Sequence, residues 1–329
     1  MMRTDNLPKG LTLRTVTMAD LEAVSELVAA YEIADYGEAE TTLEDMRNEW
    51  QSPNMNLETD TRVVTTPTGR MVGYAETMHF LHARIFGWLF VHPEYSEQGV
   101  REALLQWVEA RAQEHIPLAA PDLRVTLNTG AASVNTAAKQ LLERAGYQLI
   151  RHFWRMEIEM QEPPQQPQWA EGITVRPMRP GEERLVYEVD EESFQDHWGH
   201  MPTPYEKWEY WMVKRSYFDP DLWFMAFEGE KPIGISLCRR TQDGMGWVNT
   251  LGVLRPWRRK GVGMALLLHS FNEFYRRGWR KAGLSVDASS LTGATRLYER
   301  AGMHATRQYD SYQKELRPGR EPSTQTISE

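Results

Sequence analysis

The chain has 329 residues, of which 41% are hydrophobic and 25% are charged, and its formal net charge is −9 at pH 7. This balance is typical of a soluble globular protein with two domains, and the acidic charge argues against general binding to nucleic acid or anionic membranes. The single cysteine, Cys238, excludes an internal disulfide, and its apolar strand pattern predicts a buried thiol. Because the sequence has no apolar leader region and no apolar run long enough to span a bilayer, we expect a cytoplasmic protein.

The first half alternates predicted strands and helices. Apolar runs predict strands, and i, i+3, i+4 spacing predicts amphipathic helices, the first of which has Asp20 as its N-cap. The strands expected here are residues 11–14, 61–66, 71–80, 85–91, 123–127 and one or two within 147–160, and the helices are residues 21–31, 104–112 and 136–145. A segment rich in proline and glutamine follows at 161–171, and we interpret it as a semi-rigid linker.

The second half repeats this order. The expected strands are residues 173–176, 222–227, 232–239, 247–253, 282–286 and terminal strands up to about 316, and the helices are residues 182–192, 264–275 and 294–301. Gly302 follows the last of these helices, as a C-terminal glycine commonly does. The tail at 318–329 has no apolar periodicity, and this pattern predicts disorder.

An internal repeat relates the two halves. The sequence GLTLR at 10–14 matches GITVR at 172–176, an offset of 172 − 10 = 162, and LLERAG at 141–146 matches LYERAG at 297–302, an offset of 297 − 141 = 156. The offset changes between the two matched segments, and we interpret residues 115–121 as a longer loop in the first copy that accounts for the change. We therefore predict a duplicated α/β domain with a mixed sheet covered by helices in each copy. The expected bounds are 1–160 and 172–317.

A basic, glycine-containing turn stands between a predicted strand and a predicted helix. It reads Arg258-x-x-Gly261-x-Gly263, and the N–H groups of such a helix start suit a phosphate. The Walker order Gly-Lys-Ser/Thr and the third glycine of a Rossmann fingerprint are absent from this turn. Together with LYERAGM at 297–303, the turn resembles the acetyl-CoA pyrophosphate loop of the GCN5-related N-acetyltransferases (GNAT). A basic surface turn without a ligand is the alternative interpretation.

The resemblance implies a fold and a set of roles. Nearly the whole chain looks like the tandem, mycothiol-synthase-type arrangement of two GNAT (acyl-CoA N-acyltransferase) domains, in which acetyl-CoA is the co-substrate. In the second copy the Val253 N–H would bind the oxyanion, Asn249 would position a water for the amine proton, and Tyr298 would protonate the leaving thiolate. The residues expected to bind the cofactor are Leu251, Val253, Arg258, Arg259, Lys260, Gly261, Val262, Gly263, Met264 and Ser290.

Two of these assignments depend on the resemblance alone. Tyr298 shares an apolar helical stripe with Ala294 and Leu297, so its periodicity by itself predicts a core position. Ser290 stands where many relatives have an asparagine that binds pantetheine, and its shorter side chain puts that contact in doubt.

The acceptor site is expected between the first helix of the second copy and its hairpin. Asp196, His197 and Trp198 could hold a cationic amine there, and the aromatic residues from Tyr205 to Trp211 could add cation–π contacts. A solvated helix end followed by packing aromatics is an equal alternative for Asp196 and His197, and it is the favoured one for the tryptophans. The sequence indicates no metal site.

The first copy lacks the chemistry of the second. The positions that match Arg258, Gly261 and Gly263 are Ser96, Gly99 and Arg101, and the position of Tyr298 is taken by Leu142. We therefore expect catalysis in the second copy alone. A first copy that still binds a CoA ligand in a modified way, without turnover, is the alternative.

The leading hypothesis is an acetyl-CoA-dependent N-acetyltransferase, a monomer or homodimer, that acts on an amine-bearing small molecule. A non-catalytic acyl-CoA-binding or regulatory protein is the alternative from another class. Neither hypothesis involves nucleic acid or a membrane.

Overall fold

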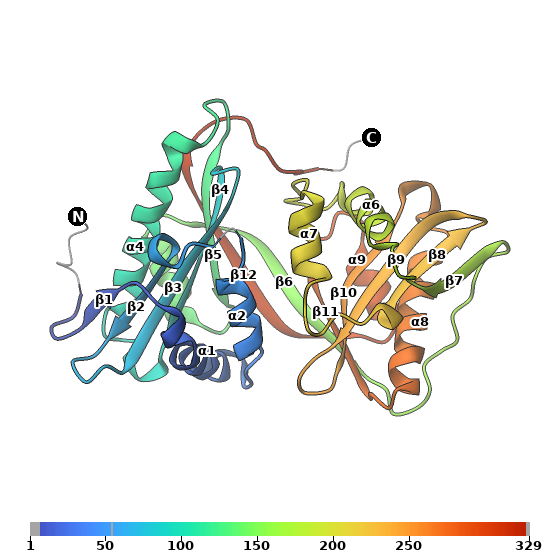
Figure 1. Cartoon of the computed structure of the whole chain (residues 1–329), viewed down its shortest axis with the longest axis horizontal. Coiled ribbons are helices and arrows are strands. Elements are labelled where there is room, and N and C mark those ends of the chain that lie inside the picture. The colour runs from blue at the N-terminus through green and yellow to red at the C-terminus, as the bar shows by residue number, and fades with distance from the viewer. Residues whose placement is uncertain (1–6, 54, 327–329) are drawn as a thin grey trace. The chain divides into compact units, whose positions relative to one another are not determined.

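The computed structural model describes residues 7–53 and 55–326, and Figure 1 shows its elements. The strands are β1 (Thr12–Arg14), β2 (Thr61–Thr65), β3 (Met71–Phe80), β4 (Arg84–Val91), β5 (Val125–Ala132), β6 (Gln148–Glu159), β7 (Ile173–Pro177), β8 (Trp223–Glu228), β9 (Lys231–Arg240), β10 (Gly246–Val253), β11 (Lys281–Asp287) and β12 (His304–Arg317). The α-helices are α1 (Leu21–Tyr36), α2 (Leu43–Trp50), α3 (Leu57–Asp60), α4 (Val100–His115), α5 (Thr136–Arg144), α6 (Glu183–Phe194), α7 (Tyr205–Met212), α8 (Val262–Arg276) and α9 (Ala294–Arg300). Within the described ranges, no helix has the length and apolar character needed to cross a membrane.

The described chain forms two compact units. One contains residues 7–151 and 309–322, and the other contains residues 152–308 and 323–326. These bounds differ from the expected 1–160 and 172–317, because β6 closes the sheet of the second unit and β12 closes the sheet of the first. Sequence order alone would have assigned each closing strand to its own copy.

The C-terminal tail is ordered over its described part, although its sequence predicts disorder. In the first unit Arg320 pairs with Leu123 in a β-bridge and donates its backbone N–H to Asp122 O at 2.7 Å. In the second unit the Thr324 N–H donates to His200 O at 3.0 Å. These bonds depend on partners far away in sequence, which explains why no local pattern reveals them. Residues 327–329 lie outside the described part.

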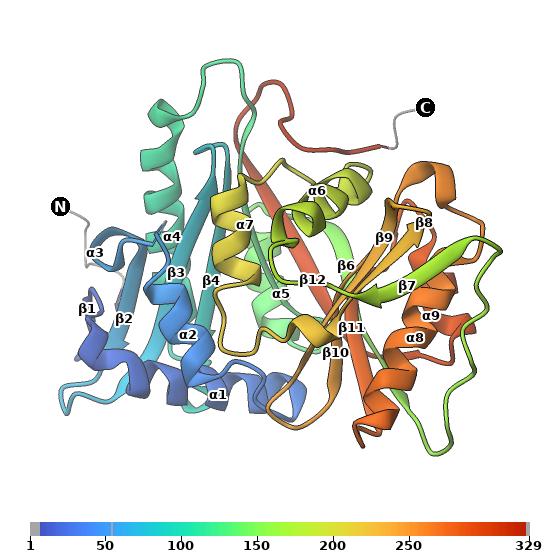
Figure 2. The same ribbon diagram turned by 45° about the vertical axis from the view of Figure 1, so that its right-hand side comes forward.

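The first unit has the strand order β1-β2-β3-β4-β5-β12. Neighbouring strands are antiparallel except β4 and β5, which run parallel through the register Arg84↔Thr126, Ile85↔Leu127 and Phe86↔Asn128. Helices α1 and α4 both pack on β3 and β4, one on each face, and α2 lies beside α1 (Figure 2). Sheet residues are therefore buried on both faces, as helices on both sides require.

The second unit repeats this plan in the order β7-β8-β9-β10-β11-β6. Helices α6 and α8 cover the two faces of β9 and β10 (Figure 1). Five successive residues of β8 are buried, Trp223 to Phe227, which is the pattern of a strand covered on both sides. The predicted mixed α/β sheet in each copy is confirmed.

An ion pair after the first strand marks the duplication at atomic detail. Arg14 binds both carboxylate oxygens of Asp20 at 2.8 Å, and Arg176 binds both oxygens of Glu182 at 2.7 Å. Since the sequence offset is again 162, the two copies share their strand–helix connection as well as their topology.

Candidate active site

A cavity of about 740 Å³ opens in the second unit where β10 and β11 separate. These parallel strands pair only at Gly246↔Ala282 and Trp247↔Gly283. The register of β10 against β9 then shifts between Val248 and Thr250, which leaves Asn249 as a bulge residue. A bulge bends its strand, so the break at Asn249 turns β10 away from β11 and creates the space.

The backbone of β10 presents polar groups to this cavity. The Leu254 N–H donates to Ile233 O across the β9 ladder at 3.0 Å. In an antiparallel pair alternate residues point to opposite edges, so the N–H and C=O of Val253 face away from β9, toward the separated strands. Consistently, Val253 O accepts a bond from Arg258 Nε at 3.0 Å, and Leu251 and Val253 line the cavity. The Val253 N–H therefore has the direction that an oxyanion donor needs.

The glycine turn brings the start of α8 to the same cavity. Gly261 is the N-cap of α8 with φ = 85°, in the left-handed region that favours glycine, and a Cβ added there would meet nothing within 4 Å. The first helical bond of α8 runs from Ala265 N to Gly261 O, so the preceding three N–H groups have no partner in the helix ladder. Gly263, at the start of α8, lines the cavity, and N–H groups at the positive end of a helix dipole suit a pyrophosphate group.

Arg258 makes several contacts within the protein. Its Nη1 binds Asp196 Oδ2 at 2.6 Å, and its Nη2 binds Ser193 O at 2.9 Å. Asp196 also accepts two bonds from Arg255 and is only 1% exposed. The bonds from Arg255, and then those from Arg258, lower the pKa of Asp196 to about 2. Asp196 thus fixes the turn to the end of α6, although both Asp196 and Arg258 border the cavity.

Tyr298 forms part of the cavity wall from α9. Its side chain is buried to 8% exposure, which agrees with the core position that periodicity predicts, yet it borders the cavity as the resemblance implies. Burial raises the pKa of Tyr298 to about 12. The phenol therefore carries its proton throughout the neutral range and can act only as a proton donor there.

The remaining predicted residues are distributed around the same cavity. Arg259, Asn249, Ser290, His197 and Trp198 all line it. Three of them have polar partners within the protein: Asn249 Oδ1 accepts from Arg239 Nε at 3.1 Å, the Trp198 indole donates to Gln325 Oε1 at 2.8 Å, and His197 Nδ1 lies 3.0 Å from Trp198 O. The other cofactor-binding candidates, Lys260, Val262 and Met264, lie in the turn and the first residues of α8.

One tryptophan of the aromatic segment belongs to the core. Trp208 is 5% exposed, packs against Trp223 and donates its indole N–H to Asp190 Oδ2 at 2.7 Å. The packing interpretation is confirmed for Trp208.

The space near β10 depends on two small residues that the sequence did not single out. A Cβ added to Gly252 would lie 2.2 Å from Ser193 Oγ, so β10 and α6 are in close contact there. The offset of 162 places Tyr31 and Phe90 at these positions in the first unit, where their rings meet edge to face at 5.4 Å. Arg101 of the first unit, which stands at the position of Gly263, adds a third large side chain here, since its guanidinium lies 5.5 Å from the centre of the Tyr31 ring. Comparing the two copies position by position is the signal that could have identified Ser193 and Gly252.

Comparisons with known proteins agree with this geometry. Residues 184–303 match the model of the acetyltransferase (GNAT) family, and residues 58–149 match an acetyltransferase (GNAT) domain. A crystal structure of a GCN5-related N-acetyltransferase from Sphaerobacter thermophilus is 36% identical, with a TM-score of 0.82 over 97% of this chain and 100% of that chain. A tandem GNAT protein from the clavulanic acid biosynthesis pathway has the same fold, with 15% identity and a TM-score of 0.70 over 94% of this chain and 100% of that one.

The chain belongs to the GNAT acetyltransferase family, and the expected family and tandem fold are confirmed. Mycothiol acetyltransferase from Streptomyces scabiei (strain 87.22) is 28% identical over 222 residues, which are 65% of this chain. The match spans 66% of that enzyme, just under two thirds of its length.

Proposed function

We propose that the chain is an acetyl-CoA-dependent N-acetyltransferase whose active site lies in the second unit. The observation that carries the proposal is the difference between the two copies. The second has an open cavity beside Gly252, Gly263 and Tyr298, whereas the first has Phe90, Arg101 and Leu142 at the same positions. Residues needed to admit and process a thioester are thus present in one copy only.

The cavity residues support a specific division of roles. Acetyl-CoA would supply the activated acetyl group as a thioester, which an acceptor amine attacks directly. The N–H groups at the start of α8 would bind the pyrophosphate, with Arg259 and Lys260 adding positive charge and Arg258 holding the turn in place. The Val253 N–H would stabilise the oxyanion, and Tyr298 would protonate the leaving thiolate. Ser290, at the opposite wall, would contact pantetheine.

We propose an amine-bearing small molecule as the acceptor. The wall of the cavity around His197 and Trp198 is aromatic, which favours a cationic amine through cation–π contacts. Asp196 is excluded from direct binding in this proposal, because both of its oxygens accept from arginines. Asn249 retains its proposed role of positioning a water for the amine proton, since it lines the cavity on the bulge.

Calorimetry with acetyl-CoA on a Gly263→Arg variant tests the cofactor site. This change copies Arg101 of the first unit, and we expect it to weaken binding more than 10-fold because the side chain occupies the approach to the α8 N–H groups. Gly263→Ala is the matched control: its Cβ would lie 3.3 Å from Leu297 Cδ1, a contact that a small shift relieves, so affinity should change little. Equal affinity in wild type and Gly263→Arg would refute the site.

Thiol release from acetyl-CoA across a library of amines separates an enzyme from a binding protein. Release that depends on one class of small amines supports the proposal. Acetyl-CoA binding without release on any amine would instead support a non-catalytic acyl-CoA-binding protein.

A further inference from the structure

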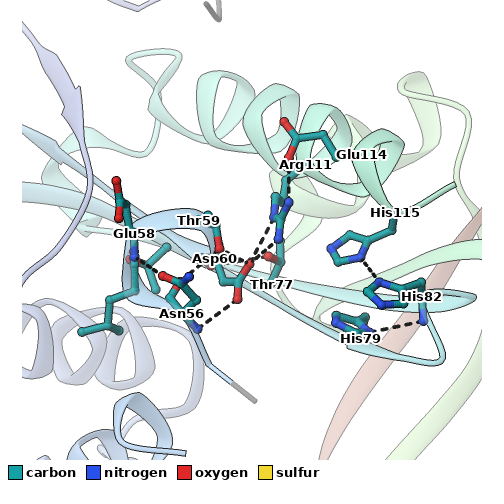
Figure 3. A network of polar contacts seen from close by, with 12 residues as sticks. Asn56, Glu58, Thr59, Asp60, Thr77, His79, His82, Arg111, Glu114 and His115 are labelled. Atoms are coloured by element: carbon teal, nitrogen blue, oxygen red, sulfur yellow. Dashed lines mark hydrogen bonds and ion pairs between the residues drawn. The ribbon is translucent and has the colours of Figure 1, made fainter. Parts of the chain in front are cut away.

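A cluster of three histidines lies in the first unit, away from the proposed cofactor site. His79 is the penultimate residue of β3, His82 lies in the β3–β4 turn and His115 is the last residue of α4. Figure 3 shows their rings together. One ligand atom from each lies within 4.8 Å of the other two. The ring centroid of His79 lies 4.0 Å from that of His82 and 4.5 Å from that of His115. Such close packing of imidazoles brings several nitrogen donors to one point.

The hydrogen bonds in the cluster leave a position that a cation can take. His82 Nδ1 and His115 Nδ1 are 2.7 Å apart, so one carries a proton and the other accepts it. A metal ion between the rings would replace that proton.

The turn that presents His82 has an unfavourable backbone. Leu81 and His82 have φ values of 52° and 53°, in the left-handed region, and the Ala83 N–H closes the turn on Phe80 O at 3.0 Å. Two successive residues other than glycine in this region are unfavourable. Asn-Gly is the usual solution for such a hairpin. A strained Leu-His pair that points His82 toward His115 indicates a function for the histidine.

The arginine beside the cluster is paired with carboxylates. Arg111, one turn before His115, binds Asp60 Oδ1 through two nitrogens at 3.1 and 2.8 Å and binds Glu114 at 2.6 Å (Figure 3). These two ion pairs offset the positive charge of Arg111.

The second copy provides an internal comparison. The offset of 162 places Arg277 at the position of His115, and Arg277 binds Asp219 at 2.7 Å and Glu273 at 2.7 Å. A guanidinium paired with two carboxylates is a structural ion pair with no metal-binding capacity. The histidine set therefore belongs to one copy and is not part of the shared fold.

We propose that His79, His82 and His115 bind a first-row divalent transition metal ion, with Zn²⁺ as the best match. Three neutral imidazoles without a carboxylate ligand suit Zn²⁺, and they do not suit Ca²⁺ or Mg²⁺, which prefer oxygen. A water molecule would complete a tetrahedral site. The sequence signal was weak, because His79-x-x-His82 is a short pair and His115 stands 33 residues further on.

Titration of the full chain, prepared without a histidine tag, with Co²⁺ and then Zn²⁺ tests the site. Visible absorption of Co²⁺ reports tetrahedral nitrogen coordination, and Zn²⁺ should displace it at one equivalent. His82→Asn removes a ligand at a position where asparagine adopts the left-handed backbone readily, and we expect at least about 100-fold weaker binding. His92→Asn is the matched control, since His92 contacts Arg70 outside the cluster, and it should bind like wild type.

Thermal unfolding separates a metal site from a purely structural cluster. Metal-free His82→Asn should be as stable as wild type or more stable, while Zn²⁺ should raise the melting temperature of wild type and His92→Asn alone. Wild type that binds no stoichiometric metal, or equal affinity of wild type and His82→Asn, would overturn the proposal.

Discussion

The contact of Gly252 with Ser193 leads to a prediction that the structure defines closely. In Gly252→Ala the new Cβ would lie 2.2 Å from Ser193 Oγ and 3.0 Å from Ser193 Cβ. Rotation of the hydroxyl removes the first clash at the cost of its bond to Asp190 O, which is 3.0 Å long, but the second clash remains. Because Ser193 O also anchors Arg258, we expect α6 to shift and the glycine turn to loosen.

A double-mutant cycle measures how much free energy of unfolding the contact between these two positions costs. Overpacking of this kind costs about 1–3 kcal/mol, and Ser193→Gly alone costs about 1 kcal/mol as a glycine in a helix. In Ser193→Gly/Gly252→Ala both clashing atoms are absent, so the double variant should be more stable than the sum of the two losses by about 1–2 kcal/mol. That coupling exceeds the roughly 0.3–0.5 kcal/mol within which independent sites add. Ser193→Ala/Gly252→Ala should be intermediate, because it retains the Cβ.

Hydrogen exchange of the α6 and β10 amides measures the local free energy of opening, and calorimetry measures acetyl-CoA affinity in the same variants. Gly252→Ala should lower both the free energy of opening and the acetyl-CoA affinity, and Ser193→Gly/Gly252→Ala should recover part of each. Equal exchange in wild type and Gly252→Ala would show that α6 does not contact β10 as closely as the structure has it. Additive losses would refute the steric explanation.

Two further predictions concern titratable groups of the second unit. Tyr298→Phe should lower kcat for the identified acceptor by about 10²–10⁴-fold with little change in KM. Tyr298→Leu, which copies Leu142, serves as the packing control, and an unchanged turnover rate in Tyr298→Phe would remove the proton-donor role. For Asp190, burial raises the pKa from 3.8 to about 6, so the folded state favours the protonated carboxyl. The free energy of unfolding is therefore undiminished below pH 4, and it falls as the pH rises through 6 and the buried carboxyl ionises. At about 1.4 kcal/mol per pKa unit, Asp190→Asn should raise the free energy of unfolding by up to about 3 kcal/mol at pH 8 and by almost nothing at pH 4. Urea unfolding at the two pH values measures this difference. The same gain at both pH values would contradict the prediction.

Most of the fold follows from local pattern and from the repeat. Strands such as β3 and β4 and helices such as α4 carry their periodicity in the sequence, and the offset of 162 gives the duplication. Short α2 was not predicted, although Thr42 and Asp45 form a capping box at its start. The closing strands could not be assigned, because the partners of β6 and β12 are set by tertiary pairing alone.

Part of the candidate site could be predicted from the sequence. Gly263, Val253 and Tyr298 follow from spacing and resemblance, and the structure brings them to one cavity. The protein contacts of Arg258 could not be predicted, because a guanidinium near a phosphate loop can bind the ligand, the protein or both. Its partner Asp196 is 62 residues away in sequence, so only the folded chain reveals this ion pair.

The two copies differ in bulk as well as in reactive groups. Gly99 keeps a left-handed φ of 75°, close to the 85° of Gly261, so the first copy retains the backbone of the turn. At the positions of Ser193 and Gly252 it has Tyr31 and Phe90, whose rings meet edge to face at 5.4 Å, and Arg101 lies beside the Tyr31 ring. On the proposal that the second copy alone binds acetyl-CoA, replacing one of these three side chains should not give the first copy cofactor affinity, because the other two remain.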